Sequence, residues 1–405
     1  MGLHIKILDC FPGACRSCYE RRIRNVQGNG HGYNLGAMLA TLKREAEREK
    51  PEDRKRNSAP CIHGGEPLLF PIGDLRKILE TVFELYGRTS IQTNGLLISD
   101  EHLAMFREFK TSLGVSIDGD TAELNRGRWN DGRFSEDHIQ QMTDRTLKNM
   151  ELAKSSGLDV SAIVVLRRYN ATPDHLSDLK RFLLRLNDMG IQSVRTNEVI
   201  VFEDKFRDEE LTEDELGHAF VRIGDLCFEN PDRQWNPYRD VVKLWTQGGD
   251  ATCVFNACDI WKTGAESAIM ADGSFGVCLK GGAALDGIQA LAAETTGAER
   301  VHALPFIPQD QGGCRGCEFW GLCGGGCPGS GIGNDWRNRT RFCGAYKRLF
   351  GYVRTRLKGL MPGIMLKDPA ERARRWSGAS VINGSGHGDS HGDSHGDRAH
   401  GDSNV

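Results

Sequence analysis

Apolar and polar positions follow two different periods along the first half of the chain. Short segments such as residues 3–9 (LHIKILD) and 159–166 (DVSAIVVL) are apolar and rich in β-branched residues, which is typical of strands. Between them lie segments with helical periodicity, such as residues 73–87 (GDLRKILETVFELYG), which ends at a glycine. Strand-like and helix-like segments alternate along the chain, so the pattern predicts βα units.

About six such units precede residue 205. Because parallel strands need long crossover connections, which are usually helices, the alternation predicts an α/β fold with a parallel sheet or barrel. The other predicted strands are residues 59–67, 89–95, 111–119 and 192–200, and the other predicted helices are residues 34–50 (capped by Asn34), 99–110, 135–157 and 172–190.

The composition and periodicity of the sequence change in the second half. Glycine and cysteine dominate residues 250–345, which is typical of a small domain organised around metal rather than around an apolar core. The repeat HGDS fills the end of the chain, and such low-complexity sequence favours disorder. We expect a barrel over residues 1–205, a helical linker over 206–250, a cysteine-rich domain over 251–350, a C-terminal helix over 351–375 and a disordered tail over 376–405.

Composition excludes several classes of protein. The 405 residues carry a formal net charge of −3, so no overall field favours nucleic acid or an anionic membrane. No run approaches the roughly 18 apolar residues of a membrane span, and MGLHIKILDC does not fit a secretion signal. We therefore expect a cytoplasmic protein that binds neither nucleic acid nor membrane. In a reducing compartment its 13 cysteines favour metal or catalytic roles over disulfides.

Three cysteines, Cys10, Cys15 and Cys18, lie close together in the stretch DCFPGACRSCYE. A disulfide staple, a zinc site and an iron–sulfur cluster with one open iron are the three interpretations. Three thiolates leave one metal position without a protein ligand, which structural zinc rarely tolerates. A 4Fe-4S cluster can use the open iron to hold a substrate or cofactor.

Eight further cysteines have the spacing of metal ligands. They are enough for two sites with four thiolates each, as in a closed 4Fe-4S cluster. Zinc remains the alternative for this half of the chain, because Cys-x2-Cys pairs are also zinc spacing. The eight are Cys253, Cys258, Cys278, Cys314, Cys317, Cys323, Cys327 and Cys343.

Several short motifs in a fixed order resemble those of the radical SAM enzymes with a C-terminal SPASM domain. The resemblance covers residues 3–345 and includes a seven-cysteine SPASM pattern from Cys258 to Cys343, with Gly273 between Cys258 and Cys278. The matching motifs are Gly64, Gly65, Glu66 and Pro67, then Thr93, Asn94 and Gly95, then Ser116, Asp118 and Gly119.

The resemblance implies a partial (β/α)6 TIM-like barrel followed by a cysteine-rich SPASM domain. It implies that the first three cysteines bind a 4Fe-4S cluster whose open iron chelates S-adenosylmethionine. Reductive cleavage would then give methionine and a 5′-deoxyadenosyl radical, which removes hydrogen from the substrate. A reductant such as flavodoxin or ferredoxin would supply the electron.

Contacts to S-adenosylmethionine are implied for residues at strand ends. Gly64, Gly65 and Glu66, in the motif that ends at Pro67, would accept hydrogen bonds from the methionine ammonium. Ser116 would lie near the cofactor carboxylate, with Asn94 in the same polar shell. Arg128 would clamp that carboxylate, or else belong to a solvated basic loop. No catalytic acid or base is assigned.

Two auxiliary 4Fe-4S clusters are also implied. Full ligation by four cysteines each favours electron transfer over substrate binding. Cys61 and Cys227 are left over, and we expect both to be buried in the core. The first set is Cys253, Cys258, Cys278 and Cys327, and the second set is Cys314, Cys317, Cys323 and Cys343.

The chain departs from the family pattern at three places. The first loop reads Cys-x4-Cys-x2-Cys where three residues usually separate the first two cysteines, and a bulge at residues 12–13 would absorb the extra residue. Ser17 stands where the family commonly has an aromatic residue. Leu279 follows Cys278 where sulfatase-maturing members have a catalytic aspartate, which argues against sulfatase maturation.

The substrate implied by the resemblance is a ribosomally synthesised precursor peptide, modified by oxidative crosslinking, thioether formation or other C–H functionalisation. The alternatives are a small metabolite, a sulfatase-type protein side chain, or no enzyme at all but a zinc scaffold. The tail over residues 376–405 is a solvated end, a weak metal site or a peptide substrate modified in cis.

Overall fold

The structure is a computed structural model of the chain. It describes residues 2–6, 15, 17–18, 32–56, 58–129, 134–249, 251, 253–258, 266–278, 300–307 and 310–377. Cys10, Leu279 and the HGDS tail lie outside the described residues, and so do residues 12–13.

One sheet organises the molecule. In the described residues it has the strand order β7-β6-β5-β4-β3-β2-β1-β8-β9. All neighbouring strands run parallel except β8 and β9, which form an antiparallel hairpin. The strands are β1 (Gly2–Lys6), β2 (Cys61–His63), β3 (Thr89–Thr93), β4 (Thr111–Ser116), β5 (Asp159–Leu166), β6 (Ser193–Glu198), β7 (Gln234–Asn236), β8 (Glu266–Ile269) and β9 (Phe275–Val277).

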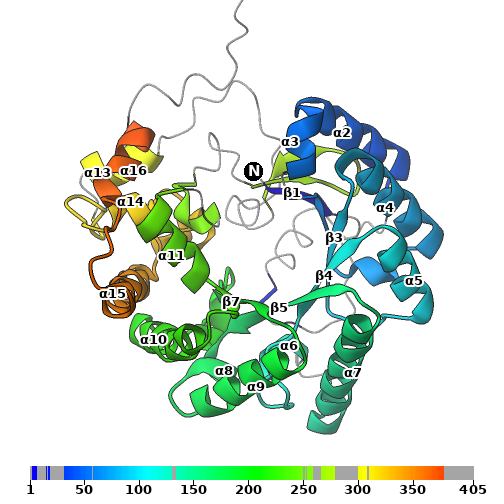
Figure 1. Ribbon diagram of the computed structural model, residues 1–405, viewed down its shortest axis with the longest axis horizontal. Helices are drawn as coiled ribbons and strands as arrows, with labels where there is room; N and C mark the ends of the chain where they lie inside the picture. Colours follow the sequence, from blue (N-terminus) through cyan, green and yellow to red (C-terminus); the bar gives the residue numbers. More distant parts are fainter. Residues whose placement is uncertain are drawn as a thin grey trace, which may run out of the picture.

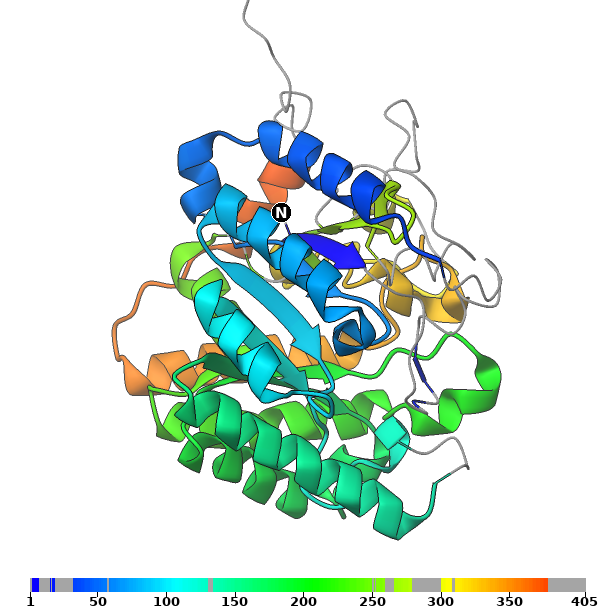
Figure 2. The same cartoon turned by 90° about the vertical axis from the view of Figure 1, so that its right-hand side faces the viewer.

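Helices cover the outer face of this curved sheet, as Figure 1 shows, and the strands surround the interior. In Figure 2 the blue and cyan helices α4 and α5 lie in front of the strands that they cover. The helices are α2 (Leu35–Glu47), α3 (Pro51–Arg56), α4 (Ile72–Tyr86), α5 (Asp100–Glu108), α6 (Arg126–Trp129), α7 (Glu136–Ser155), α8 (Arg168–Ala171), α9 (Leu176–Asp188), α10 (Glu213–Glu229), α11 (Tyr238–Gln247), α13 (Arg300–Phe306), α14 (Trp320–Cys323), α15 (Cys343–Leu360) and α16 (Pro369–Ser377).

Residues along the strands alternate in burial, so the face of the sheet under the helices is buried and the interior face is more exposed. In β5 the side chains of Val160, Ala162, Val164 and Leu166 are at most 2% exposed and pack under the helices. The intervening residues of β5 are half-buried. Because successive strand residues point to opposite faces, these half-buried positions line the interior.

Local signals place the helix ends where the sequence predicts them. The Asn34 side chain accepts a hydrogen bond from Ala37 N at 3.0 Å and caps α2. Gly87 ends α4 with a φ of 73°, a left-handed conformation that glycine adopts without strain. The predicted α/β fold, a partial parallel barrel, is confirmed, and each predicted strand and helix of residues 1–205 is present.

Two strands outside residues 1–205 extend the sheet. The predicted helical linker contains α10 and α11 and also β7, which pairs with β6. Inside the predicted cysteine-rich domain, β8 pairs directly with β1. Both departures involve strands of three or four residues, too short to give a periodic signal. The domain boundaries themselves stay predictions.

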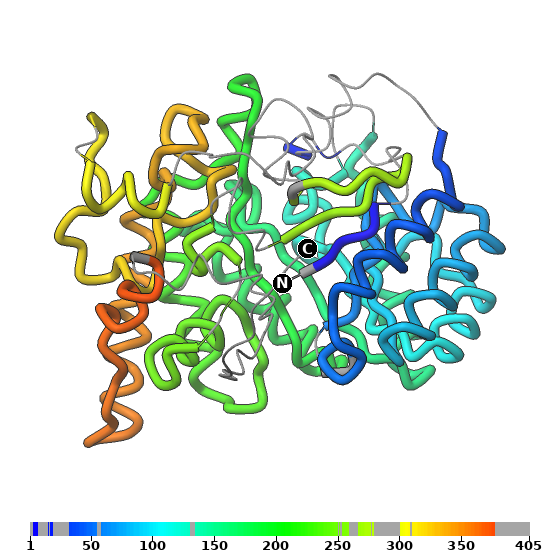
Figure 3. Tube along the Cα trace, turned by 90° about the horizontal axis from the view of Figure 1, so that it is seen from above, coloured from blue at the N-terminus to red at the C-terminus, as the bar shows by residue number. Residues whose placement is uncertain are grey.

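The C-terminal helices lie on the opposite side of the molecule from α2, α4 and α5, as Figures 1 and 3 show. Helix α15 packs on α10 and α11, and α14 packs on α16. None of the described helices is long and apolar enough to cross a membrane.

Candidate functional site

The carboxyl ends of the parallel strands carry the residues that the sequence singled out. Glu66 follows β2 and begins the short 3-10 helix η1 (Pro67–Leu69), and Asn94 follows β3. Ser116 ends β4, and Arg128 lies in α6 just after it. Since parallel strands end at the same edge of a sheet, the fold brings these residues to one rim, which is where barrel enzymes build their sites.

Glu66 ties the glycine-rich loop to the end of β3. Its carboxylate is 1% exposed and accepts hydrogen bonds from Leu68 N at 3.1 Å, Thr93 Oγ1 at 2.5 Å and Asn94 N at 2.8 Å. Burial raises the pKa of Glu66, while these hydrogen bonds and the charge of Arg128 oppose that rise. Three of the roughly four acceptor positions of a carboxylate are used within the protein. The contact of Glu66 with the cofactor stays a prediction.

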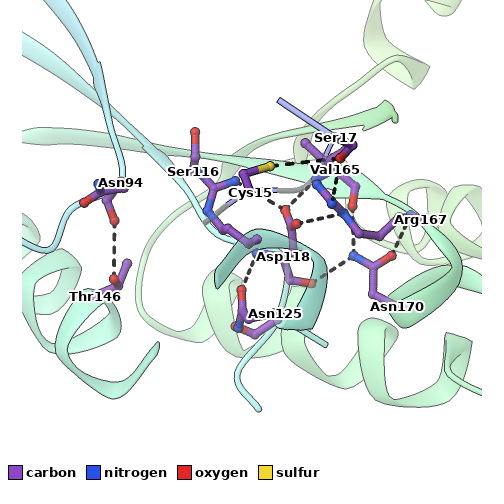
Figure 4. Close-up of polar contacts among 12 residues, drawn as sticks. Cys15, Ser17, Asn94, Ser116, Asp118, Asn125, Thr146, Val165, Arg167 and Asn170 are labelled. Carbon is purple, nitrogen blue, oxygen red and sulfur yellow. Dashed lines mark hydrogen bonds and ion pairs between the residues drawn. The ribbon is translucent and has the colours of Figure 1, made fainter. Parts of the chain in front are cut away.

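Asn94 and Ser116 are both held by hydrogen bonds. The Asn94 side chain accepts from Leu96 N at 2.8 Å, and its carbonyl accepts from Thr146 Oγ1 at 3.3 Å (Figure 4). Ser116 Oγ accepts from Gln92 Nε2 at 2.7 Å. Their predicted role in cofactor binding is a proposal, but the structure places both at the rim.

Arg128 is largely buried at the rim. Its side chain is only 13% exposed, and Nη1 lies 3.8 Å from Oδ1 of the fully buried Asp118. Burial against a carboxylate fixes the guanidinium at the rim. This burial disfavours the alternative of a solvated basic loop, and the contact of Arg128 with the cofactor stays a prediction.

Asp118 is the centre of a buried polar network. Its backbone N–H donates to Asn125 Oδ1 at 2.9 Å, and its Oδ1 accepts from Val165 N at 2.9 Å. Its other oxygen, Oδ2, lies 3.2 Å from Arg167 Nε. The carboxylate thus joins the loop after β4 to the end of β5 (Figure 4).

Sequence reasoning missed Arg167, which is 1% exposed. Its Nη1 donates to Glu209 Oε2 at 2.8 Å and to Ser17 Oγ at 3.1 Å. Burial lowers the pKa of Arg167, but Asp118, Cys15 and Glu209 outweigh burial, so the pKa is raised. Only its place directly after a strand marks Arg167 in the sequence, because its partners come from distant segments.

Two of the three N-terminal cysteines lie within the described residues. Cys15 and Cys18 are half-buried, and Cys18 N donates to Cys15 O at 3.4 Å, which closes a turn. Cys15 Sγ lies 4.0 Å from Ser17 Oγ. The structure therefore places this loop beside Arg167, at the rim that carries Asp118.

A second polar cluster lies inside the barrel. His4 Nε2 on β1 is 3.0 Å from Glu266 Oε2 on β8. Burial would lower the pKa of His4, but hydrogen bonds and charge from Cys61 and Glu266 raise it to about 10. Cys61 is therefore not buried in the core as we expected, because it is half-buried beside His4 on the interior face of β2.

The other unassigned cysteine, Cys227, behaves as predicted for a packing residue. It is half-buried, packs against the hydrophobic core, and burial raises the pKa of its thiol to about 11. A cysteine packed among apolar side chains in this way is typical of a structural residue.

The remaining cysteines gather into two sets of neighbours. Burial raises the pKa of Cys253, and the nearby Glu266, Cys327, Cys258 and Cys278 raise it further. Burial likewise raises the pKa of Cys323, with added effects from Cys314, Cys343 and Cys317. We call these four-cysteine groups the Cys253 set and the Cys323 set. Their members are those that the sequence assigns to the first and second auxiliary clusters.

All four thiols of the Cys323 set line one pocket, together with the basic residues Arg339 and Lys347. Burial raises the pKa of Cys314 to about 12, with Cys343 and Cys317 adding to the effect. Such thiols stay neutral until a cation offsets their charge, so metal binding would release protons.

Arg300 at the start of α13 lies between the two sets. It is 1% exposed and donates to the carbonyls of Cys258 at 3.2 Å and Gly325 at 2.9 Å. It also donates to the carbonyls of Gly326 at 3.2 Å and Asn338 at 3.0 Å. Burial lowers the pKa of Arg300, and nearby cysteines of both sets oppose that change. One guanidinium therefore fixes the loops of both sets.

The ligand chemistry of the Cys253 set and the Cys323 set fits iron–sulfur clusters. Each set supplies four thiols, the usual ligands of a 4Fe-4S cluster. Among the described residues no group of three or more His, Cys, Asp or Glu side chains surrounds a point for one metal ion. A cubane cluster takes each thiolate on a different iron, so its ligands need not converge as zinc ligands do.

A parallel barrel with a cysteine loop and a glycine-rich motif at one rim is the arrangement of a radical SAM enzyme. Residues 12–183 match the family described as the Radical SAM superfamily, so this part of the chain is a radical SAM domain. An uncharacterized protein of Methanothermobacter thermautotrophicus is 35% identical over 180 residues, which span 42% of this chain and 60% of that relative.

Two further comparisons cover more of the chain. A serine-type anaerobic sulfatase-maturating enzyme of Klebsiella aerogenes is 25% identical over 305 residues, 72% of this chain and 70% of that enzyme. The solved structure of native anSMEcpe with bound AdoMet and Kp18Cys peptide superposes with a TM-score of 0.68. It is 18% identical and covers 89% of this chain and 98% of its own, which establishes a shared fold.

Proposed function

We propose that the chain is a radical SAM oxidoreductase that generates a 5′-deoxyadenosyl radical and oxidatively modifies a ribosomally synthesised peptide. The modification would be a crosslink, a thioether or another C–H functionalisation. The observation that carries the proposal is the pairing of a barrel rim with two four-cysteine sets. Oxidation of a substrate requires an acceptor for its electrons, and 4Fe-4S clusters ligated by four cysteines are suited to electron transfer.

At the rim the cofactor contacts would come from the strand ends. Cys10, Cys15 and Cys18 would hold the 4Fe-4S cluster that binds S-adenosylmethionine. The residues that would contact S-adenosylmethionine are Gly64, Gly65, Glu66, Pro67, Asn94, Ser116 and Arg128.

The protein's own contribution is to fix these groups in place. Glu66 keeps the glycine-rich loop against β3, so the loop backbone stays open to a ligand. Asp118 holds Arg128 at the rim, where its guanidinium suits a carboxylate. Preorganised donors of this kind orient a ligand without reorganisation when it binds.

In the cysteine-rich region the two sets would bind the auxiliary clusters of a SPASM domain. Cys253, Cys258, Cys278 and Cys327 would hold the first, and Cys314, Cys317, Cys323 and Cys343 the second. Glu266 lies close to Cys253, a member of the Cys253 set. Its carboxylate also pairs with His4 in the barrel interior. An electron leaving a substrate in the barrel would therefore meet this set first and pass outward through the second set. A reductant such as flavodoxin or ferredoxin would supply the electron for cofactor cleavage.

A peptide substrate is favoured by the relative of Klebsiella aerogenes, whose name assigns it to sulfatase maturation and hence to a protein side chain. Leu279 directly after Cys278 departs from the catalytic aspartate expected of a sulfatase maturase. A peptide other than a sulfatase is therefore the leading substrate. A sulfatase side chain and a small metabolite remain the alternatives.

Anaerobic purification followed by turnover tests the proposal. We expect roughly 12 irons per chain, four for each of three clusters, and cleavage of S-adenosylmethionine under reductant. Candidate precursor peptides, taken from the genes that neighbour this one, should lose hydrogen by mass spectrometry. Roughly four irons would refute the auxiliary clusters, and turnover of a metabolite with unchanged peptides would refute the peptide substrate. An unmodified HGDS tail after turnover would exclude modification in cis.

A further inference from the structure

The cysteine loop carries a serine where an aromatic residue is usual, and the structure gives that serine a partner. Ser17 Oγ accepts a hydrogen bond from Arg167 Nη1 at 3.1 Å and lies 4.0 Å from Cys15 Sγ. In Figure 4 the Arg167 side chain extends from β5 toward the loop, with Asp118 beside it. A bulky ring at position 17 would occupy the space that this hydrogen bond needs.

Arg167 cannot move away from the loop easily. Its side chain is 2% exposed and is paired with two fully buried carboxylates, through Nη1 to Glu209 at 2.8 Å and through Nε to Asp118 at 3.2 Å. Breaking such a buried pair is costly because it leaves an uncompensated charge. The guanidinium is thus a fixed positive group beside the cysteine loop.

The same side chain reaches Cys15 through Ser17, whose Oγ accepts from Arg167 Nη1 and lies 4.0 Å from Cys15 Sγ. Hydrogen bonds and positive charge near a cluster sulfur stabilise the reduced cluster, because reduction adds negative charge that the sulfurs share. The network therefore touches a ligand atom of the proposed cluster, although Arg167 is not itself a ligand.

We propose that Arg167 is a positioning residue that holds Ser17 beside Cys15 and raises the reduction potential of the cluster bound by Cys10, Cys15 and Cys18. The inference rests on the proposed cluster. Glu209 opposes Arg167, since its carboxylate offsets part of the positive charge. The balance between these two buried groups then sets how readily the cluster accepts an electron.

Potentiometric titration of reconstituted protein tests this inference. The signal to follow is the electron paramagnetic resonance spectrum that changes when S-adenosylmethionine is added. Arg167→Gln should lower the ratio of reduced to oxidised cluster at a fixed potential about tenfold, a shift of about 59 mV to more negative potential for one electron. Glu209→Gln should shift the midpoint in the opposite direction.

Arg168→Gln is the matched control. Arg168 is the next residue, its side chain is 41% exposed, and it pairs with Glu215 at 3.2 Å away from the loop. Its replacement should leave the midpoint unchanged. Ser17→Ala should lower iron content or broaden the spectrum, because it removes the hydrogen bond that fixes the loop while leaving both buried carboxylates paired.

The outcomes separate the inference from the proposed function. Wild-type protein without a signal responsive to S-adenosylmethionine would overturn both. A normal wild-type signal with unchanged midpoints in Arg167→Gln and Glu209→Gln would overturn the inference alone. If Arg167→Gln fails to retain iron, that loss supports the positioning role, and Glu209→Gln then decides the effect on potential.

Discussion

The main chain at Gly273 packs directly against Ala37 of helix α2. A Cβ built on Gly273 would lie 2.4 Å from the Ala37 Cβ and 2.7 Å from its carbonyl carbon. The Gly273 carbonyl accepts a hydrogen bond from Thr41 Oγ1 at 2.7 Å. The hairpin that precedes Cys278 thereby packs closely against α2.

Gly273→Ala should therefore destabilise the protein by at least about 2 kcal/mol, since a left-handed residue with φ of 86° gains a side chain that clashes with backbone. Urea unfolding of the apoprotein measures the loss. Gly36→Ala on the facing helix is the control, because its new methyl group meets nothing closer than 3.6 Å. Equal stability of the two variants would contradict the close packing.

Substitution of single cysteines should separate cofactor cleavage from product formation. Cys15→Ala should abolish cleavage of S-adenosylmethionine, because it removes a ligand of the rim cluster. Cys317→Ala should retain cleavage but stop product formation, because it affects only the Cys323 set. Both products are quantified by liquid chromatography, and Cys227→Ser serves as the control for loss of an unrelated thiol. Retained cleavage in Cys15→Ala would refute the assignment of this cysteine to the cluster.

Arg300 should matter for both four-cysteine sets at once. Arg300→Met keeps much of the volume but removes the hydrogen bonds to four carbonyls, of which that of Gly325 keeps a further donor, Thr340 N, and this should cost about 3 kcal/mol or more. We expect iron to be lost from both sets while the rim cluster keeps its response to S-adenosylmethionine. Iron analysis and electron paramagnetic resonance measure this, and the exposed Arg315→Met is the control. Loss confined to one set would show that Arg300 does not couple them.

The start of α10 should contribute stability that depends on pH. Thr212 and Glu215 form a reciprocal capping box, with Glu215 N donating to Thr212 Oγ1 at 3.2 Å and Thr212 N donating to Glu215 Oε2 at 2.8 Å. Burial would raise the pKa of Glu215, but the Thr212 hydrogen bonds and the charge of Arg168 outweigh it and lower the pKa.

A carboxylate whose pKa is lower in the folded state stabilises the protein above its unfolded pKa of about 4.3, and this stability is lost as pH falls through the folded value. Glu215→Gln should thus cost about 1 kcal/mol at neutral pH and progressively less below pH ~4. Denaturant unfolding at several pH values measures the difference. Glu229→Gln at the other end of α10 should show no such loss, since an acidic residue there opposes the helix dipole.

The parts of the fold that the sequence predicts are those set by interactions between residues close together in the chain. Asn34 and Gly87 mark helix ends through contacts with residues at most four positions away, so composition and spacing suffice. Arg167 could not be found in this way, because its partners Ser17 and Glu209 lie 150 and 42 positions away. The motif residues Glu66 and Asp118 were found by resemblance, but their role in binding the protein's own loops needed the structure.

The pairing of β8 with β1 makes the two halves of the chain inseparable. A fragment that stops near residue 250 would expose the edge of β1 that pairs with β8, and a bare strand edge invites pairing with other chains. Truncation to an isolated barrel should therefore yield aggregates, and the cysteine-rich half is as much a part of the scaffold as of the chemistry.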